Sequence, residues 1–215
     1  MQEGNGRNGN GNGNGNGNGH RQDLETLLSK SVAMHGHLCP GQVLGVRMSM
    51  RACSELGVAD PELEPKRLIV YVEIDRCATD AIAAVTGCRL GKRTLKHVDY
   101  GKMAATFLDT VSGRAVRVVA REDSRANVGH YVSADLPKYE AQQEAYKVMP
   151  DDELFDVQEV QMAVRTEDRP GPTVSRVICQ CCGEGINDAR EVRMNGRVLC
   201  RSCANGGYYQ PEASS

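Results

Sequence analysis

Residues 67–85 read RLIVYVEIDRCATDAIAAV, in which an apolar, β-branched run passes into a short alanine-rich stretch. The eight residues from Arg67 to Ile74 favour a buried strand over a helix. The strand is expected to end at Asp75. Residues 78–85 then have helical character, with Thr79 as the expected cap. The predicted unit is therefore a buried strand that leads directly into a short helix.

Two amphipathic helices are predicted before this unit. The first begins after Asp23, a plausible cap, and its apolar face carries Leu24, Leu27, Leu28 and Val32. The second covers residues 42–56, where apolar side chains recur every three or four residues, and Pro40 opens it near its first turn. A turn over residues 35–41 is expected to join the two helices.

Further strands are predicted after the unit, at residues 94–99, 103–110, 115–119 and 154–164. The second and third of these read as a hairpin through Ser112 and Gly113. Residues 135–149 are expected to form a helix. Helices followed by mixed strands and helices indicate an α+β domain.

The chain divides into four parts by composition. Residues 4–19 contain eight of the 23 glycines and seven asparagines, so residues 1–20 are predicted to form a flexible tail. The core domain is predicted over residues 21–166. A polar, proline-containing linker follows over residues 167–173, and a small second module covers residues 174–209.

The overall composition excludes several classes of protein. The 215 residues are 40% hydrophobic and 25% charged, which is typical of a soluble globular protein. The 26 basic and 28 acidic residues give a net charge of −2, which disfavours nucleic acid as a partner. Neither a run of eighteen apolar residues nor an apolar signal sequence is present, so we expect no membrane association and a cytoplasmic location.

The second module contains two C-x-x-C pairs, Cys179 with Cys182 and Cys200 with Cys203, separated by seventeen residues. This spacing is typical of a closed, four-thiolate structural zinc site. Asn195-Gly196 predicts a two-residue hairpin between the pairs, and the second pair is expected where a short helix begins. The segment is too poor in apolar groups to fold alone, so the metal should supply the folding energy.

Charge balance in the module agrees with zinc. Residues 176–203 carry five arginines against Glu184, Asp188 and Glu191, a sum of +2, whereas four thiolates and one Zn²⁺ contribute −2. Cys181 could replace Cys179 or Cys182 as a ligand, although the register before Gly183 favours Cys182. A redox dithiol pair or free cysteines are the alternative interpretation.

A second constellation lies in the core domain, where His35, His37 and Cys39 alternate in the segment HGHLC just before a helix. Alternation directs the three side chains to one side if the segment is extended, and a helix N-terminus lowers the pKa of a nearby thiol. Cys77 follows the buried strand and could meet them in space. Two imidazoles and two thiolates suit Zn²⁺ or Fe²⁺, and three ligands would leave an open position for catalysis.

The remaining candidates have weaker support. In a catalytic interpretation, Cys39 would bind the metal or act as an activated thiolate, and His37 would bind the metal or move protons. Lys102 could then stabilise negative charge. Cys53 is expected in the core. Cys88 is expected to pack in a turn, with a third thiol near the site as the alternative.

These motifs resemble one known family. The runs HGHLCPGQVLGVRM (35–48) and VEIDRCATDAIAAVTGCRLGKRTLKHVDYGKMAATF (72–107), followed by two C-x-x-C pairs, closely resemble the FmdE family of formylmethanofuran dehydrogenase proteins. The resemblance covers about residues 22–206. It implies a thioredoxin-like, mixed five-stranded sheet flanked by helices, followed by a treble-clef zinc finger. It also implies a site at His35, His37 and Cys39, with Cys77 as the next candidate.

The resemblance implies an accessory role in one-carbon metabolism and methanogenesis, beside the subunits of a molybdenum or tungsten oxidoreductase. Whether the chain is itself part of an enzyme stays open. The cofactors implied are a structural zinc and a second zinc or iron in the core domain. The alternatives are a non-catalytic zinc-binding interaction module and a thiol redox protein that uses Cys39 with Cys77 or Cys88. A homodimer through exposed strand edges is also compatible with the sequence.

Overall fold

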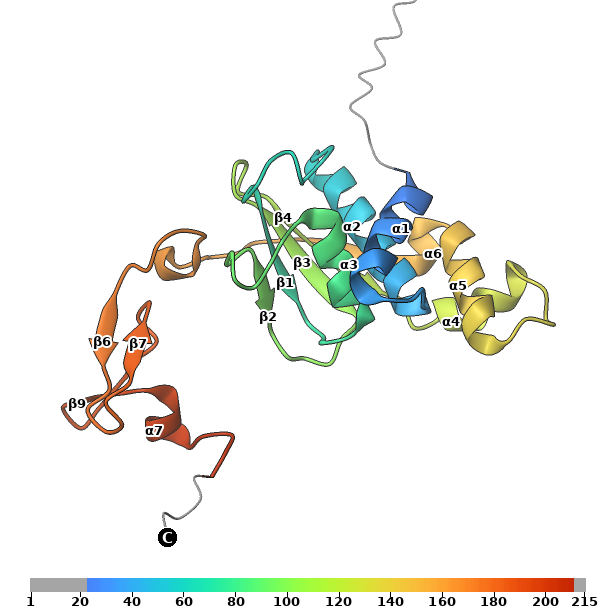
Figure 1. The fold of residues 1–215 in the computed structure, drawn as a ribbon. Coiled ribbons are helices and arrows are strands. Elements are labelled where there is room, and N and C mark those ends of the chain that lie inside the picture. The colour runs from blue at the N-terminus through green and yellow to red at the C-terminus, as the bar shows by residue number, and fades with distance from the viewer. Residues whose placement is uncertain (1–22, 211–215) are drawn as a thin grey trace, which may run out of the picture.

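The structure is a computed structural model that describes residues 23–210. The tail predicted over residues 1–20 lies outside the described residues. Four helices pack together on one face of a sheet (Figure 1). They are α1 (Leu24–His35), α2 (Pro40–Leu56), α3 (Cys77–Thr86) and α5 (Lys138–Val148).

The helix starts follow from local chemistry. The Asp23 carboxylate accepts a hydrogen bond from the backbone N–H of Thr26 at 2.9 Å, so Asp23 caps α1 as predicted. Pro40 is the first residue of α2. The expected cap of α3 was wrong: α3 begins at Cys77 after Arg76, and Thr79 lies in its first turn, where its hydroxyl donates to the Ile74 carbonyl at 2.6 Å.

The sheet has five strands in the order β2-β1-β3-β4-β5. Their bounds are Leu68–Val72 for β1, Leu95–His97 for β2, Ala104–Asp109 for β3, Ala115–Ala120 for β4 and Phe155–Val160 for β5. The β1 and β2 strands are parallel and are connected through α3, whereas the other neighbours are antiparallel. The predicted α+β class with a mixed five-stranded sheet is confirmed.

Alternation along the strands divides the interior into two clusters. In β1, Leu68, Val70 and Val72 face the helices and join the large core, while Ile69 joins a smaller cluster on the opposite face of the sheet. That second face also holds a buried ion pair, in which Arg117 makes two hydrogen bonds of 2.6 and 2.7 Å to the Glu73 carboxylate. Both faces of the central strands are therefore covered.

Four short helical segments of the core domain and linker were not predicted from the sequence. They are α4 (Ser124–Asn127), α6 (Asp151–Leu154) and the 3₁₀ turns Val128–His130 and Thr166–Asp168. A single helical turn is too short to show a hydrophobic period, which explains why the pattern did not indicate them.

The C-terminal module consists of two hairpins and a helix. Strands β6 (Arg176–Ile178) and β7 (Gly185–Asn187) form the first hairpin, and β8 (Val192–Met194) and β9 (Arg197–Leu199) form the second. Asn195 and Gly196 both have positive φ, 52° and 74°, as the predicted two-residue turn requires. Helix α7 (Arg201–Asn205) follows directly, which completes a treble-clef arrangement.

The module lies beyond the β2 edge of the sheet, away from the helices (Figure 1). One ion pair joins it to the core domain: Arg93 Nη1 lies 2.9 Å from Asp188 Oδ2. The second carboxylate oxygen of Asp188 accepts from the backbone N–H of Val174 at 2.9 Å. A single largely buried carboxylate thus connects the loop before β2 with the module.

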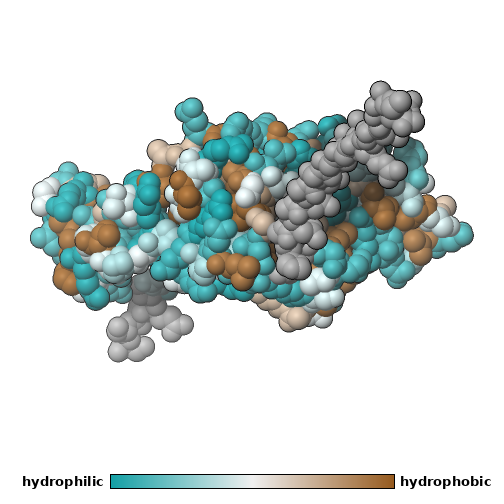
Figure 2. Space-filling view, turned by 90° about the horizontal axis from the view of Figure 1, so that it is seen from above, coloured by the Kyte–Doolittle hydropathy of each residue, from teal (hydrophilic) through white to brown (hydrophobic). Residues whose placement is uncertain are grey.

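The surface view in Figure 2 shows hydrophobic side chains in small groups separated by hydrophilic ones on the face that it presents. Within residues 23–210, none of the helices combines the length and the apolar character that crossing a bilayer requires.

Close contact between α2 and α3 depends on glycine. A Cβ built on Gly45 would lie 2.5 Å from the Ala78 carbonyl oxygen and 2.7 Å from the Ala81 Cβ. Both distances are below the contact distance of real atoms, so only glycine allows this separation of the helices. The start of α3, and with it Cys77, is therefore placed by the absence of a side chain at position 45.

We predict that Gly45→Ala lowers the free energy of unfolding by about 1–3 kcal/mol, because the overpacking cost exceeds the gain of about 1 kcal/mol in helix propensity. Urea denaturation measures the change. Gly129→Ala is the control, since a Cβ there meets no atom within 4 Å. A Gly45→Ala protein as stable as the wild type would contradict this account of the helix contact.

Candidate metal centres

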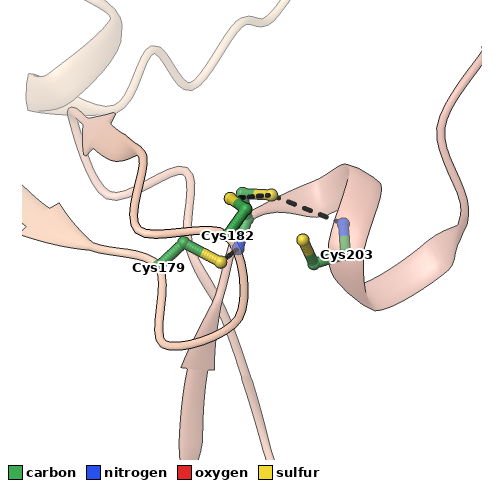
Figure 3. Close-up of side chains that lie close together, drawn as sticks. Cys179, Cys182 and Cys203 are labelled. Carbon is green, nitrogen blue, oxygen red and sulfur yellow. Dashed lines mark hydrogen bonds between the residues drawn. The ribbon is translucent and has the colours of Figure 1, made fainter. Parts of the chain in front are cut away.

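Four sulfur atoms converge in the C-terminal module. The Sγ atoms of Cys179, Cys182, Cys200 and Cys203 all lie within 4.8 Å of one another. Figure 3 shows Cys179 and Cys182 on the loop that joins β6 to β7, and Cys203 on α7. Cys200 is the N-cap of α7. The geometry groups Cys182 with the other three, while Cys181 is exposed and lies outside the set.

Backbone N–H groups prepare two of these sulfurs, those of Cys179 and Cys200, for a cation, whereas neighbouring thiols raise the pKa of Cys182 and Cys203. The N–H of Cys200 donates to Cys179 Sγ at 3.2 Å, and the N–H of Cys203 donates to Cys200 Sγ at 3.4 Å. The N–H groups of Cys182 and Cys200 lower the pKa of the Cys179 thiol to about 6, so this sulfur is a thiolate at neutral pH. A thiolate is the form that binds zinc.

The module has almost no hydrophobic core without a metal. Its buried cluster consists of Cys179, Ile186 and Leu199, and one of these three is a candidate ligand. So few apolar side chains cannot offset the entropy of ordering the segment.

We predict that Cys182→Ser lowers the bound zinc by about one equivalent and unfolds the module, because a structural zinc site supplies most of the folding free energy of such a segment. Metal analysis together with NMR of the full chain measures both effects. The matched control is Cys181→Ser, which removes a neighbouring thiol outside the cluster. Zinc loss in the control, or zinc retention in Cys182→Ser, would show that the ligand set is different.

The core domain brings three further donors together. Candidate ligand atoms of His35, His37 and Cys39 lie within 4.8 Å of one another. His35 is the last residue of α1, and Gly36 caps that helix with φ of 101°, a left-handed conformation that turns the chain back at once. The rings of His35 and His37 are consequently 4.8 Å apart between centroids. Cys39 is the N-cap of α2.

His35 is oriented as metal-binding histidines usually are. Its Nδ1 lies 2.8 Å from Asp80 Oδ2, so the carboxylate fixes the ring orientation. Its Nε2 is buried and has no hydrogen-bond partner within the described part of the chain. A buried polar nitrogen without a partner is costly, and a metal ion at this point would satisfy it. The residues present therefore fit a bound metal.

Cys77 lies beside this group but is not one of the three. It is the first residue of α3, and its thiol is near enough to that of Cys39 for the two to influence each other electrostatically. Burial and the neighbouring Cys39 thiol raise the pKa of Cys77. Gly41 permits the approach, because a Cβ at position 41 would lie 3.1 Å from the Cys77 Cβ and 3.8 Å from Cys39 Sγ.

A buried polar chain holds the three helices at this point. The Gln42 side chain is fully buried, and its Nε2 donates to the Cys77 carbonyl at 2.6 Å. The Ser31 hydroxyl donates to Gln42 Oε1. These two hydrogen bonds link α1, α2 and α3 close to the candidate ligands.

A cleft of about 590 Å³ opens beside the group. His37, Cys39 and Cys77 line one part of it, so two of the three candidate ligands are accessible from outside the fold, whereas His35 is not part of the lining. Enclosed but accessible donors are typical of catalytic or exchangeable metal sites, whereas the four sulfurs of the C-terminal module leave no free position.

The other sequence candidates lie elsewhere. Lys102 is exposed, with its ammonium 5.8 Å from the centroid of the Tyr100 ring, and it does not line the cleft, although its neighbour Met103 does. Cys53 and Cys88 are buried in the large core, as expected. Cys88 Sγ lies 3.5 Å from the Leu68 carbonyl oxygen.

Sequence reasoning missed Asp80, Gln42 and Ser31. The only sequence signal for Asp80 is its place one helical turn after Cys77 on α3. That signal points to a site only when α1, which carries His35, is known to pack against α3. Gln42 and Ser31 interrupt apolar helix faces at buried positions, which is an observable sign of a buried hydrogen bond.

A mixed sheet with helices on one face, a His/Cys cluster at the turn between α1 and α2 and a four-cysteine treble clef define the class of protein. Residues 34–164 match the FmdE family, described as molybdenum formylmethanofuran dehydrogenase operon. Residues 172–209 match the prokaryotic DksA/TraR C4-type zinc finger. The first match covers well over half of the chain, so the chain belongs to the FmdE family.

Two individual proteins are also similar to this chain. A probable S-adenosyl-L-methionine-binding protein of Archaeoglobus fulgidus is 30% identical over 209 residues, which cover 86% of this chain and 54% of that protein. The chain therefore spans about half the length of this curated relative. The crystal structure of a tungsten formylmethanofuran dehydrogenase FmdE-like protein from Syntrophus aciditrophicus has a TM-score of 0.58 and 21% identity, with 88% of this chain and 96% of that chain covered. This second similarity shows the fold.

Proposed function

We propose that the chain is a metal-binding accessory protein of the FmdE type, which acts in the cytoplasm beside a molybdenum or tungsten oxidoreductase. Its core centre would hold zinc or iron through His35, His37 and Cys39, and its finger would hold structural zinc. The observation that carries the proposal is the Nε2 of His35, which is buried without a partner among residues 23–210 and lies beside the donors of His37 and Cys39.

The donor set supports this chemistry. Two imidazoles and one thiolate suit Zn²⁺ and Fe²⁺, and a three-ligand set leaves a position for an incoming molecule. When bound, the metal would supply a Lewis acid. The residues of the chain would supply orientation, because Asp80 accepts the Nδ1–H of His35 and so fixes that ring toward the metal.

We predict that Asp80→Asn weakens metal binding at the core centre by about 10- to 100-fold, because removing a carboxylate that orients a histidine ligand costs about that much. Zinc titration of the full chain against a competing chelator separates this centre from the tighter finger site. The matched control is Asp75→Asn, an exposed aspartate just before α3 with no ion pair or side-chain hydrogen bond in the described structure.

Equal zinc affinity in wild type, Asp80→Asn and His35→Ala would contradict the core metal centre. The thiol redox alternative has its own support, since Cys39 and Cys77 line the same cleft on either side of Gly41. It would be favoured if the core bound no metal and mild oxidation removed two titratable thiols in the wild type, but not in Cys39→Ser or Cys77→Ser.

The accessory role is tested by co-expression with the molybdenum- or tungsten-containing subunits of a formylmethanofuran dehydrogenase. We expect the chain to co-purify with them through several columns. Comparison of Cys39→Ser with Cys182→Ser then separates two functions. Loss of dehydrogenase activity with retained association in Cys39→Ser supports a working core centre. Full activity in Cys39→Ser and loss of association in Cys182→Ser would favour the non-catalytic interaction module.

A further inference from the structure

The cleft beside the core centre is built from three helices. The starts of α2 and α3 form one side, and residues of α5 form another, because α5 packs against α2. Its volume of about 590 Å³ is within the range of small-molecule sites. Since its mouth includes His37, Cys39 and Cys77, any molecule bound there would reach the candidate ligands.

Charge in the cleft is of one sign. Arg76 and Arg125 line it, and none of the described residues that line it is acidic, although the whole chain carries a net charge of −2. Arg76 makes no ion pair or side-chain hydrogen bond with the described residues. Arg125 has one exposed partner, Glu122, whose carboxylate lies 3.3 Å from its Nε. An exposed pair of this kind contributes little and can be exchanged for a ligand.

Two uncapped helix starts face the same space. α2 has 17 residues and α3 has 10, and neither N-cap, Cys39 or Arg76, makes a capping hydrogen bond with its side chain. Pro40 has no N–H, and the N–H groups of Gln42 and Thr79 donate to the carbonyls of the N-cap residues. The N–H groups of Gly41, Cys77 and Ala78, together with the helix dipoles, favour an anion. This feature is independent of the two arginines and has the same sign.

The rest of the lining has mixed chemistry. Leu38, Leu44 and Met103 provide apolar surface, and α5 adds the amides of Gln142 and Gln143. Apolar walls with a few polar groups suit an organic molecule better than an inorganic ion.

We propose that this cleft binds a small organic anion, a carboxylate or a phosphate ester, with its anionic group between Arg76 and Arg125 and its other end toward Cys39 and His37. The inference rests on the proposed function in that the far end of the ligand would face the core metal. Arg76 and Arg125 are then the residues that select for charge.

The test uses zinc-loaded full chain and three probes of similar length: hexanoate, hexyl phosphate and the uncharged 1-hexanol. We expect either anion to bind at least about tenfold more tightly than hexanol in calorimetric or NMR titrations. Arg76→Gln and Arg125→Gln should each weaken anion binding by about tenfold and leave hexanol unaffected. Arg169→Gln, an exposed linker arginine without an ion pair, is the control and should change nothing.

The relative affinities of hexanoate and hexyl phosphate identify the preferred anionic group. Equal binding of anions and hexanol, or anion binding insensitive to both arginine substitutions, would overturn the proposal. Metal analysis of the same samples keeps it separate from the proposed function. Charge-selective binding in a chain without core metal supports the cleft and rejects the metal centre, whereas two bound metals without charge selectivity reject the cleft alone.

Discussion

The buried amide of Gln42 joins three helices at the point where the candidate metal ligands meet. Its Nε2 donates to the Cys77 carbonyl on α3, and its Oε1 accepts from Ser31 on α1. Loss of either partner would leave a buried polar group unsatisfied, at a cost of about 1–3 kcal/mol. Because both ends are satisfied in only one arrangement of the helices, the end of α1 and the starts of α2 and α3 are fixed together. The positions of His35, Cys39 and Cys77 follow from that arrangement.

The sequence predicted those parts of the sites that are local in the chain. The spacing within each C-x-x-C pair and the Asn195-Gly196 turn determine the local backbone geometry, and the four sulfurs and the hairpin lie as that spacing predicts. The HGHLC segment likewise holds three donors within five residues. Strand positions were also predictable, because β-branched runs and alternation are local signals. Fold class and the two clusters of donors therefore needed no tertiary information.

What could not be predicted depends on packing between distant segments. The pairing of His35 with Asp80 requires α1 to pack against α3. That packing depends on the buried hydrogen bond between Ser31 and Gln42, and on Gly45, which lets α2 approach α3. Lys102 was named only for its positive charge, whereas the cations that line the cleft, Arg76 and Arg125, come from the start of α3 and from α4. No spacing rule connects residues 76 and 125. Only the packing of α5 against α2 creates the space that they share.

The two centres would give the same metal opposite electrostatic character. Four thiolates around Zn²⁺ leave a doubly negative unit, which needs the arginines of the finger and has no position for another ligand. Two neutral imidazoles and one thiolate around Zn²⁺ leave a single positive charge, in a cleft that already contains two arginines and two uncapped helix starts. Coordination by Cys77 as a fourth ligand would cancel that charge, so the Cys77 thiolate and the far end of a molecule bound in the cleft would compete for one position. Because Cys77 lies outside the three-donor group, the arrangement of the described residues would leave that position to the bound molecule.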